Sequence, residues 1–473
     1  MRAMVLFIGT IFALAGCAGN DVPKGAARQF SLAVNPANVT LFSGSSGTTL
    51  LALTPYDGFS GTVSLRLRQG DGSAPPSGLS LNPTSVTVAG AVINQTLSIA
   101  ADTSIPEGTY DLELVGSSGT TEHAVGLTLE VSRPACVAIA AGNHYSLAIM
   151  SNGTLWVFGN NYYGQLGTGD TTNRLIPTQT MWDVAQASGG ASHTLVTTRD
   201  GSLWAFGNNW ASALGTGDDI DHHSPVLVGS NARYVSAGEF HYSFAIDTGG
   251  ALWAFGNNSY GQLGTGDTNN RPTPTQIMGD VVNVATGYAH TLVVKGDGTV
   301  WAFGSNSHGQ LGTGDTTDRS YPVLIMNDAV QAAAAFRHSF VIKRDGTLWA
   351  FGSNGYGQLG TGTEGADQVT PTQVMAGVIK VAAGRKHTLV LRSDGTVWVF
   401  GEGSSGQLGT GDTTDKLLPV RIMSGAKDIA AGDYHSLVLK NDGSLWAFGK
   451  NTFGQLGLGD DSNRHVPTRV DFP

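Results

Sequence analysis

Apolar and polar positions alternate in short segments throughout the C-terminal two-thirds of the sequence. Near the end of the chain such segments occupy 428–432, 435–440 and 444–449, and a fourth lies at 466–470. The pair Asp442-Gly443 separates the second segment from the third, and an Asp-Gly pair between two strand-like runs is a strong signal for a β-hairpin. The pattern therefore predicts four consecutive antiparallel strands.

This four-strand pattern recurs seven times and carries two markers. A tryptophan returns every 48 or 49 residues, as Trp156, Trp204, Trp253, Trp301, Trp349, Trp398 and Trp446. A serine or threonine stands ten positions before each tryptophan, as Ser146, Thr194, Ser243, Thr291, Ser339, Thr388 and Ser436. A repeat of this length without helical periodicity predicts a radial array of four-stranded sheets. We therefore predict an all-β chain in which residues 137–473 form a seven-bladed β-propeller. A β-solenoid is the alternative, although its coils are usually shorter.

Residues 30–132 also show short alternating segments, but these do not follow the repeat. Eight alternating segments separated by Gly, Pro, Asn and Ser predict a small antiparallel β-sandwich; they begin with 30–34, 39–42, 49–53 and 63–67 and continue with 86–88, 96–99, 109–115 and 125–131. Gly58-Phe-Ser-Gly-Thr-Val63 and Pro106-Glu-Gly-Thr-Tyr110 resemble the immunoglobulin-like modules of exported bacterial proteins. The resemblance implies a spacer that lifts the propeller off a membrane.

The N-terminus has the pattern of a processing segment. Arg2 precedes an apolar run, 5–15, that is too short to span a bilayer. Leu14-Ala-Gly-Cys17 resembles the bacterial lipobox, which implies a signal peptide at 1–17, a lipid on Cys17 and a polar tether at 18–29. An ordinary signal peptide with an incidental cysteine is the alternative. The residue two places after Cys17 is Gly19, which favours sorting to the outer membrane, so the expected location is the bacterial cell envelope.

Charge and cysteine usage limit the possible partners and chemistry. The formal net charge is −10, and no run of Lys and Arg occurs, so we predict no nucleic-acid partner. Cys136 is the only other cysteine. It is predicted to be a free, buried thiol, because a lone Cys without a matched His and acid is weak evidence for a nucleophile.

A glycine-rich string follows each tryptophan, and its clearest copies are Gly261-Gln-Leu-Gly-Thr-Gly-Asp267 and the strings that begin at Gly309 and Gly406. Residues 137–473 thereby resemble the regulator of chromosome condensation repeat family, which implies a seven-bladed propeller. A phosphate-binding loop would need a Gly-Lys-Ser/Thr ending and a following helix, and both are missing from the pattern. We therefore predict structural glycines, a Leu that packs between blades, a Gln that satisfies backbone groups, and no cofactor.

Residues that recur in every copy are interpreted as scaffold. A His or Tyr precedes each marker Ser or Thr, and a ring of such residues fits buried hydrogen-bonding roles better than a single active site. Asp170 with Arg174, and the equivalent pairs in later copies, are expected to be local ion pairs in turns. We therefore predict no catalytic residue and no resident metal.

A binding site is expected where copies depart from the consensus. The candidates are Trp182, Trp210, Asp219, Asp221, His222, His223, Phe336, Arg337, Glu364, Asp367 and Glu402. Exposed aromatic and arginine side chains are the residue types that anchor interfaces, whereas the Asp/His cluster at 218–223 has a divalent metal site as its alternative.

The predicted function is that of a lipid-anchored, non-enzymatic binding or scaffold protein. It is expected to be a monomer that holds a protein partner or an extracellular polymer on one propeller face. One alternative is a propeller enzyme, a lyase or glycosidase acting on polysaccharide. The other is guanine-nucleotide exchange on a small GTPase, which the family resemblance implies but which an exported chain with uniform copies does not favour.

Overall fold

The computed structural model describes residues 29–102 and 104–473, which fall into two compact units, one ending at Arg133 and the other beginning at Pro134. The predicted signal peptide and Cys17 lie outside the described residues, as does the tether except for its last residue. No helix in the described part of the chain is long and apolar enough to cross a membrane.

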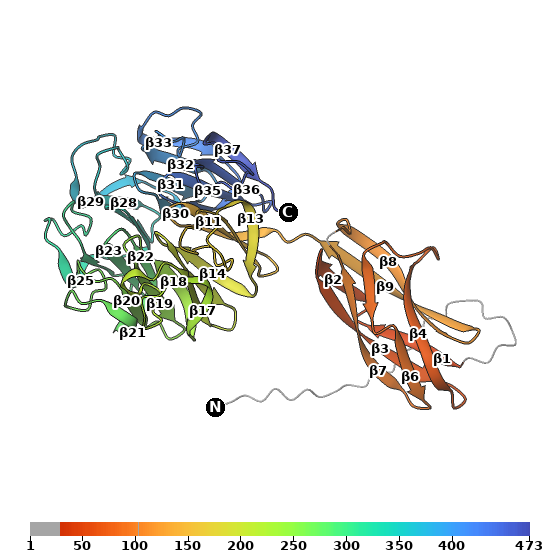
Figure 1. Ribbon diagram of the computed structural model, residues 1–473. Helices are drawn as coiled ribbons and strands as arrows, with labels where there is room; N and C mark the ends of the chain where they lie inside the picture. Colours follow the sequence, from red (N-terminus) through yellow and green to blue (C-terminus); the bar gives the residue numbers. More distant parts are fainter. Residues whose placement is uncertain (1–28, 103) are drawn as a thin grey trace. The chain divides into compact units, whose positions relative to one another are not determined.

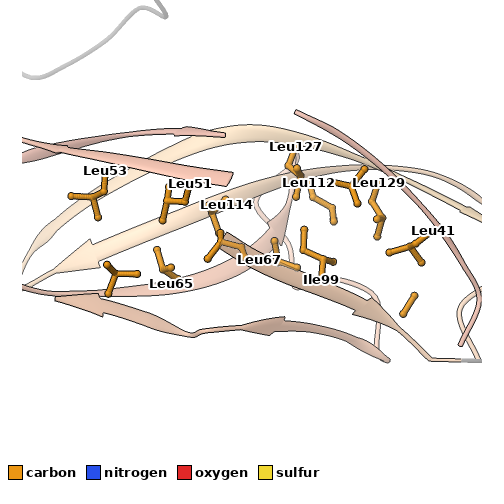
Figure 2. Packing of buried hydrophobic residues seen from close by; sticks show 14 of the residues in the cluster. Leu41, Leu51, Leu53, Leu65, Leu67, Ile99, Leu112, Leu114, Leu127 and Leu129 are labelled. Carbon is orange, nitrogen blue, oxygen red and sulfur yellow. The ribbon is translucent and has the colours of Figure 1, made fainter. Parts of the chain in front are cut away.

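The first unit consists of two β-sheets that share one hydrophobic core. One sheet has the order β1-β3-β7-β5 and the other β2-β9-β8-β4-β6. Figure 2 shows leucines of both sheets, among them Leu51 and Leu114, directed into the same interior. The strands are β1 (Phe30–Asn35), β2 (Asn38–Phe42), β3 (Ser46–Pro55), β4 (Ser60–Gln69), β5 (Leu79–Asn82), β6 (Ser85–Ala89), β7 (Ile93–Ala101), β8 (Gly108–Ser118) and β9 (Thr121–Ser132).

Two details of this unit differ from the prediction. The sequence pattern missed β5, because its four residues are too few to show a clear alternation before Pro83. The unit is also not purely antiparallel, since β2 runs parallel to β9. The chain bends after β1, which pairs with β3 in one sheet, and enters the other sheet as β2. Such a switch of sheets leaves no mark in the alternation of apolar residues.

The second unit contains seven four-stranded antiparallel sheets, and each is formed by four consecutive strands arranged around a common centre (Figure 1). These sheets are the seven predicted blades. Blade 1 has β10 (Cys136–Ala141), β11 (Tyr145–Met150), β12 (Leu155–Gly159) and β13 (Arg174–Met181). Blade 2 has β14 (Val184–Gly189), β15 (His193–Thr198), β16 (Leu203–Gly207) and β17 (His222–Gly229), with a 3-10 turn η1 (Trp210–Ser212). Blade 3 has β18 (Ala232–Ala237), β19 (Tyr242–Asp247), β20 (Leu252–Gly256) and β21 (Arg271–Met278). Blade 4 has β22 (Val281–Thr286), β23 (His290–Lys295), β24 (Val300–Gly304) and β25 (Arg319–Met326).

The remaining three blades continue the same order to the C-terminus. Blade 5 has β26 (Ala329–Ala335), β27 (His338–Lys343), β28 (Leu348–Gly352) and β29 (Gln368–Met375). Blade 6 has β30 (Val378–Ala383), β31 (His387–Arg392), β32 (Val397–Gly401) and β33 (Lys416–Met423). Blade 7 has β34 (Ala426–Ala431), β35 (His435–Lys440), β36 (Leu445–Gly449) and β37 (Arg464–Val470).

Strand order gives the propeller two different faces. The loop between the first and second strands of a blade lies on the same face as the long glycine-rich loop between its third and fourth strands, and the two loops are hydrogen-bonded to each other, as between Asn160 N–H and the His144 carbonyl (2.9 Å). We call this the long-loop face. The hairpin turns and the connections between blades lie on the opposite, short-turn face, and β10 starts and β37 ends there.

The marker Ser or Thr joins each blade to the preceding one. Its hydroxyl donates to a main-chain carbonyl in the glycine-rich loop of the preceding blade, as Thr194 does to Gln165 (2.7 Å). The same bond occurs at Ser243, Thr291, Ser339, Thr388 and Ser436. Ser146 closes the ring by donating to the Gln455 carbonyl of blade 7 (2.7 Å). The seven markers are therefore inter-blade contacts, and the ring closes without exchange of a strand between blades.

The His or Tyr before each marker is buried, as predicted, and six of the seven also bridge blades. His435 in blade 7 contacts Ser146 Oγ through Nε2 (2.9 Å), and His193, His290 and His387 make the same contact with the serine of the following blade. Tyr145 instead donates to the His193 carbonyl (2.6 Å). The exception is His338, which is buried and whose two ring nitrogens have no hydrogen-bond partner among residues 29–102 and 104–473.

The repeated tryptophans belong to the scaffold, which agrees with their interpretation from the sequence. Each lies in the third strand of its blade and is partly buried. In blade 1 the indole N–H donates to Thr154 Oγ1 (3.0 Å) of the preceding hairpin turn, and the same bond forms in blades 4 to 7. Cys136 is buried in the core shared by blades 1 and 7, and burial raises the pKa of its thiol to about 12.

Candidate docking site on the long-loop face

The structure separates the two unrepeated tryptophans. Trp210 lies in the glycine-rich loop of blade 2, on the long-loop face, and its side chain is 51 % exposed. Trp182 is 69 % exposed but lies in the connection between blades 1 and 2, on the short-turn face. The other sequence candidates occupy loops of the long-loop face or the strand ends that follow them; they are Asp219, Asp221, His222, His223, Phe336, Arg337, Glu364, Asp367 and Glu402.

Several of these candidates have roles inside their own loops. The Asp221 carboxylate accepts from the Asn209 N–H (2.7 Å), and an Asn or Asp occupies the same position in every other blade. Asp219 accepts from Ser212 Oγ (2.7 Å). His222 takes the place of the arginine that pairs with a turn Asp in blades 1, 3, 4 and 7, and its Nε2 lies 3.9 Å from Asp218 Oδ1. Within residues 29–102 and 104–473, no three or more His, Cys, Asp or Glu side chains are placed to hold a metal ion.

Two further candidates are at opposite extremes of exposure. Glu364 is exposed in the loop of blade 5, whereas Glu402 is 9 % exposed at the start of the equivalent loop of blade 6. Glu402 accepts from Ser404 Oγ (3.0 Å), and its second carboxylate oxygen is buried with no hydrogen-bond partner in the part of the chain that the structure describes. His223 is exposed at the start of β17. Among the described residues, the aromatic rings in contact with Trp210 are those of Phe240 and His241, and not that of His223.

Trp210 is one end of a continuous row of aromatic rings across blades 2 to 5. The row consists of Trp210, Phe240, Tyr260, Tyr288 and Phe336, and we call it the aromatic strip. Ring centroids are 5.8 Å apart between Trp210 and Phe240, 4.7 Å between Phe240 and Tyr288, and 5.1 Å between Tyr288 and Phe336. Tyr260 contacts Phe240 at 5.9 Å. Phe336 and Trp210, which the sequence singled out separately, therefore belong to one surface.

The strip depends on an inserted residue that our reading of the sequence missed. Six blades have two residues between the Gly or Ala at or just after the end of the first strand and the His or Tyr that begins the second, as in Gly287-Tyr-Ala-His290. Blade 3 has three residues in Gly238-Glu-Phe-His-Tyr242, and His241 adopts a positive φ of 57° to accommodate the extra one. Phe240 is at the centre of the strip. The insertion could have been found in the sequence from the step of 49 residues between Trp204 and Trp253, since most steps between repeated tryptophans are 48 residues.

A second step of 49 residues, from Trp349 to Trp398, marks the loop of blade 5. There the residue that caps the loop N–H is Asp367, which comes 13 positions after Asn354 and not 12 as in blades 1 to 4, 6 and 7. Asp367 also reaches blade 4, where its Oδ2 lies 2.7 Å from His308 Nδ1. Both length changes in the repeat therefore modify the same face.

Beside the strip, three charged residues from different blades meet near the axis. Asp433 of blade 7 is 4 % exposed and its Oδ2 lies 3.6 Å from Arg385 Nη1 of blade 6. Burial raises the pKa of Asp433 to about 6, although Arg385 opposes the shift. Burial and the charge of Asp433 raise the pKa of Glu239 in blade 3 well above its usual range. The three residues form an acid–arginine cluster that no repeat pattern predicted.

Asp433 should contribute measurably to the pH dependence of the free energy of unfolding. Its folded-state pKa lies above that of an unfolded aspartate, so the folded chain binds the extra proton, and this contribution to stability is lost as pH rises through about 6. From pH 5.5 to 7.5, Asp433→Asn should gain about 1 kcal/mol in free energy of unfolding relative to the wild type. Urea unfolding of both proteins at the two pH values tests this, and a difference that does not change with pH would refute it.

Family models match most of the second unit. A model described as the RCC1-like domain matches residues 280–473. Models of the regulator of chromosome condensation (RCC1) repeat match residues 152–197, 200–245 and 249–294, and a second repeat model matches 136–165 and 233–262. No curated protein shows a significant match to the sequence.

Solved structures show the same architecture. Human WBSCR16 is 25% identical, with a TM-score of 0.61 over 68% of this chain and 94% of its own. Yeast RCC1 (Prp20), in its complex with Kap60, is 20% identical, with a TM-score of 0.62 over 72% of this chain and 85% of its own. Prp20p of Saccharomyces cerevisiae by itself is 21% identical, with a TM-score of 0.62 over 70% and 88%. The repeat matches and the seven blades together show that the second unit is an RCC1-like β-propeller domain built from regulator of chromosome condensation repeats.

Proposed function

We propose that this protein is a non-enzymatic binding module that holds a protein partner on the long-loop face of its propeller. The observation that supports this most strongly is the aromatic strip. Its five rings come from the inner loops of blades 3, 4 and 5 and from the glycine-rich loops of blades 2 and 3. Tyr260 is at a repeat position that is also aromatic in blades 1, 5 and 7, whereas Trp210, Phe240, Tyr288 and Phe336 depart from the repeat. Trp, Tyr and Arg dominate the energetic centres of protein interfaces because they combine large apolar area with polar ends.

The arrangement of the rings favours a protein over a polysaccharide. Sugar rings stack on aromatic faces that are open and roughly coplanar. In the strip, Trp210 and Phe240 meet at an interplanar angle of 60°, and Tyr288 and Phe336 meet at 68°. The rings therefore cover part of one another's faces and present edges, which fits a broad apolar interface with irregular side chains.

The long-loop face is also opposite the point where the propeller is attached to the preceding chain. β10 starts on the short-turn face, directly after Arg133-Pro134. We propose that residues 1–17 are a lipoprotein signal peptide, that Cys17 carries the lipid anchor in the cell envelope, and that the first unit is an immunoglobulin-like spacer. The covalent attachment is therefore on the face of the propeller opposite the loops that we assign to the partner.

Site-specific photo-crosslinking in the cells that produce the protein tests this function. A photoreactive phenylalanine analogue replaces Tyr260 in the full chain, where the native side chain is 42 % exposed. The matched control carries the analogue at Trp182, which is more exposed but lies on the short-turn face. We expect a covalent adduct of discrete mass with another protein from position 260 only, and its loss when Phe240→Ala is added. Equal adducts from both positions, or none from position 260, would count against the proposal.

A further inference from the structure

Two arginines converge on the Phe336 end of the aromatic strip. The Cζ atom of Arg385 lies 4.2 Å from the centroid of the Phe336 ring, and the Cζ atom of Arg337 lies 4.8 Å from the same centroid. Their positive charges therefore lie within about 9 Å of each other and repel. Stacking on an aromatic face leaves the planar N–H forks free to bind an anion.

Neither guanidinium is fully paired within the chain. No carboxylate of residues 29–102 or 104–473 forms an ion pair with the exposed Arg337. Arg385 has Asp433 at 3.6 Å, which is longer than a charge-assisted hydrogen bond, and its buried Nε has no partner in the described residues. Glu239, the other acid of the cluster, has a pKa raised well above its usual range by burial and by Asp433. The Arg385 side chain is 37 % exposed, so part of its guanidinium remains open to an anionic group from outside.

A chain of two hydrogen bonds, formed by side chains of blades 4 and 5, positions Arg337. His308 Nδ1 lies 2.7 Å from Asp367 Oδ2, and Arg337 Nη1 donates to His308 Nε2 over 3.0 Å. Because Nε2 accepts this bond, the proton of the neutral imidazole is on Nδ1 and points to Asp367. The lengthened loop of blade 5 therefore supplies the carboxylate that orients the ring, and the ring in turn orients the guanidinium.

We propose that Arg337 and Arg385 receive a carboxylate side chain of the protein partner, an aspartate or glutamate whose apolar neighbours lie on the aromatic strip. This inference rests on the proposed function, since it names what the partner presents to the long-loop face. Charge complementarity supports it, because an anion would be held by two planar N–H forks and would relieve their mutual repulsion. The aromatic strip adjoins the two arginines and adds apolar area to the proposed interface.

A displayed library of random 12-residue peptides, selected on the immobilised full chain, tests the inference. We expect enriched peptides that contain Asp or Glu beside an aromatic or aliphatic residue. A synthetic peptide of this kind should lose about tenfold or more in affinity when its acid is changed to the amide, and the same amount on Arg337→Gln. Arg337→Lys should restore only part of the loss, because Lys keeps the charge but not the fork. Arg344→Gln, an exposed arginine of the same blade on the short-turn face, should have no effect.

The outcomes separate this inference from the proposed function. Peptides that lose binding on Phe240→Ala but carry no acid would overturn the carboxylate site and leave the binding function intact. Peptides that bind Phe240→Ala as well as the wild type do not use the strip, and they would count against both. A selection that enriches no peptide would also count against both.

Discussion

Acidification from pH 7.5 to 5.5 is expected to remove about 7 kcal/mol from the free energy of unfolding of the propeller. The cause is five histidines that are completely buried between blades: His193, His290, His338, His387 and His435. Burial lowers the pKa of each to about 3 from an ordinary 6.5. The unfolded chain therefore binds protons that the folded chain does not, and stability is lost as pH falls from about 6.5 toward 3.

The hydrogen bonds explain why these rings stay neutral. The single proton of the Ser146 hydroxyl is donated to the Gln455 carbonyl, so this hydroxyl can only accept from His435 Nε2–H. The second ring nitrogen of His435 is buried without an acceptor, and the same is true of His193, His290 and His387. A second proton would add a buried charge with nothing to pair it.

Tryptophan fluorescence is a suitable measurement, because all nine tryptophans lie in the second unit and only this unit is followed. Urea unfolding at a series of pH values should give a slope of at least five protons taken up, because burial also lowers the pKa of His144, to about 4, and that of His241. A slope near zero or one proton would contradict the prediction that the buried histidines are neutral in the folded chain. His223→Gln removes an exposed histidine and should leave the slope unchanged.

A double substitution should reduce by one the number of protons that the propeller takes up on unfolding. Tyr145 occupies the histidine position in blade 1, and its OH, which donates to the His193 carbonyl, lies 2.9 Å from Thr194 Oγ1 of blade 2. The blade that follows His338 likewise has a threonine, Thr388, as its marker, so tyrosine is the matched residue at position 338. A Cβ on Gly142 would lie 2.0 Å from the Tyr145 ring, so His338→Tyr needs Ala335→Gly beside it. The pair should keep the fold and lower the slope by about one proton.

Gly432→Ala is expected to lower the free energy of unfolding by about 3–5 kcal/mol. A Cβ at this position would lie 2.2 Å from His435 Cε1 and 2.4 Å from the Gly142 carbonyl oxygen. The imidazole would have to leave Ser146, and the main chain of blade 1 would have to move. The substitution therefore disrupts the contact that closes the ring between the last blade and the first.

Blade 5 shows the consequence in the native chain. Ala335 stands where the other blades have glycine, and His338 is the histidine that has lost both partners. Urea unfolding of Gly432→Ala should be compared with Gly355→Ala, where an added Cβ meets nothing within 4 Å. The control should remain within about 0.5 kcal/mol of the wild type. Equal stability of the two variants would show that the ring does not depend on this close approach.

The repeat made the blades predictable from local patterns. Strand alternation, Asp-Gly turns and the two markers are all encoded within about 48 residues, and each copy supplies the same information again. The interpretation of the histidines, the Gln-Leu pair and the tryptophans as scaffold was also accessible, since a residue present in every copy cannot define a single site. The edge strand β5 and the parallel pairing of β2 with β9 were not, because they depend on contacts with distant strands.

The candidate site could be predicted only in fragments. Trp210, Phe336, Arg337 and Asp367 were recognisable as departures from the repeat, but Trp182 looked equivalent to Trp210 and lies on the other face. Glu239, Arg385 and Asp433 come from blades 3, 6 and 7, and no local spacing relates them. They meet because the first and last blades close the ring and turn all seven inner loops toward one axis. Local sequence thus defined the blade, and ring closure, which is a long-range contact, placed the unrepeated side chains together.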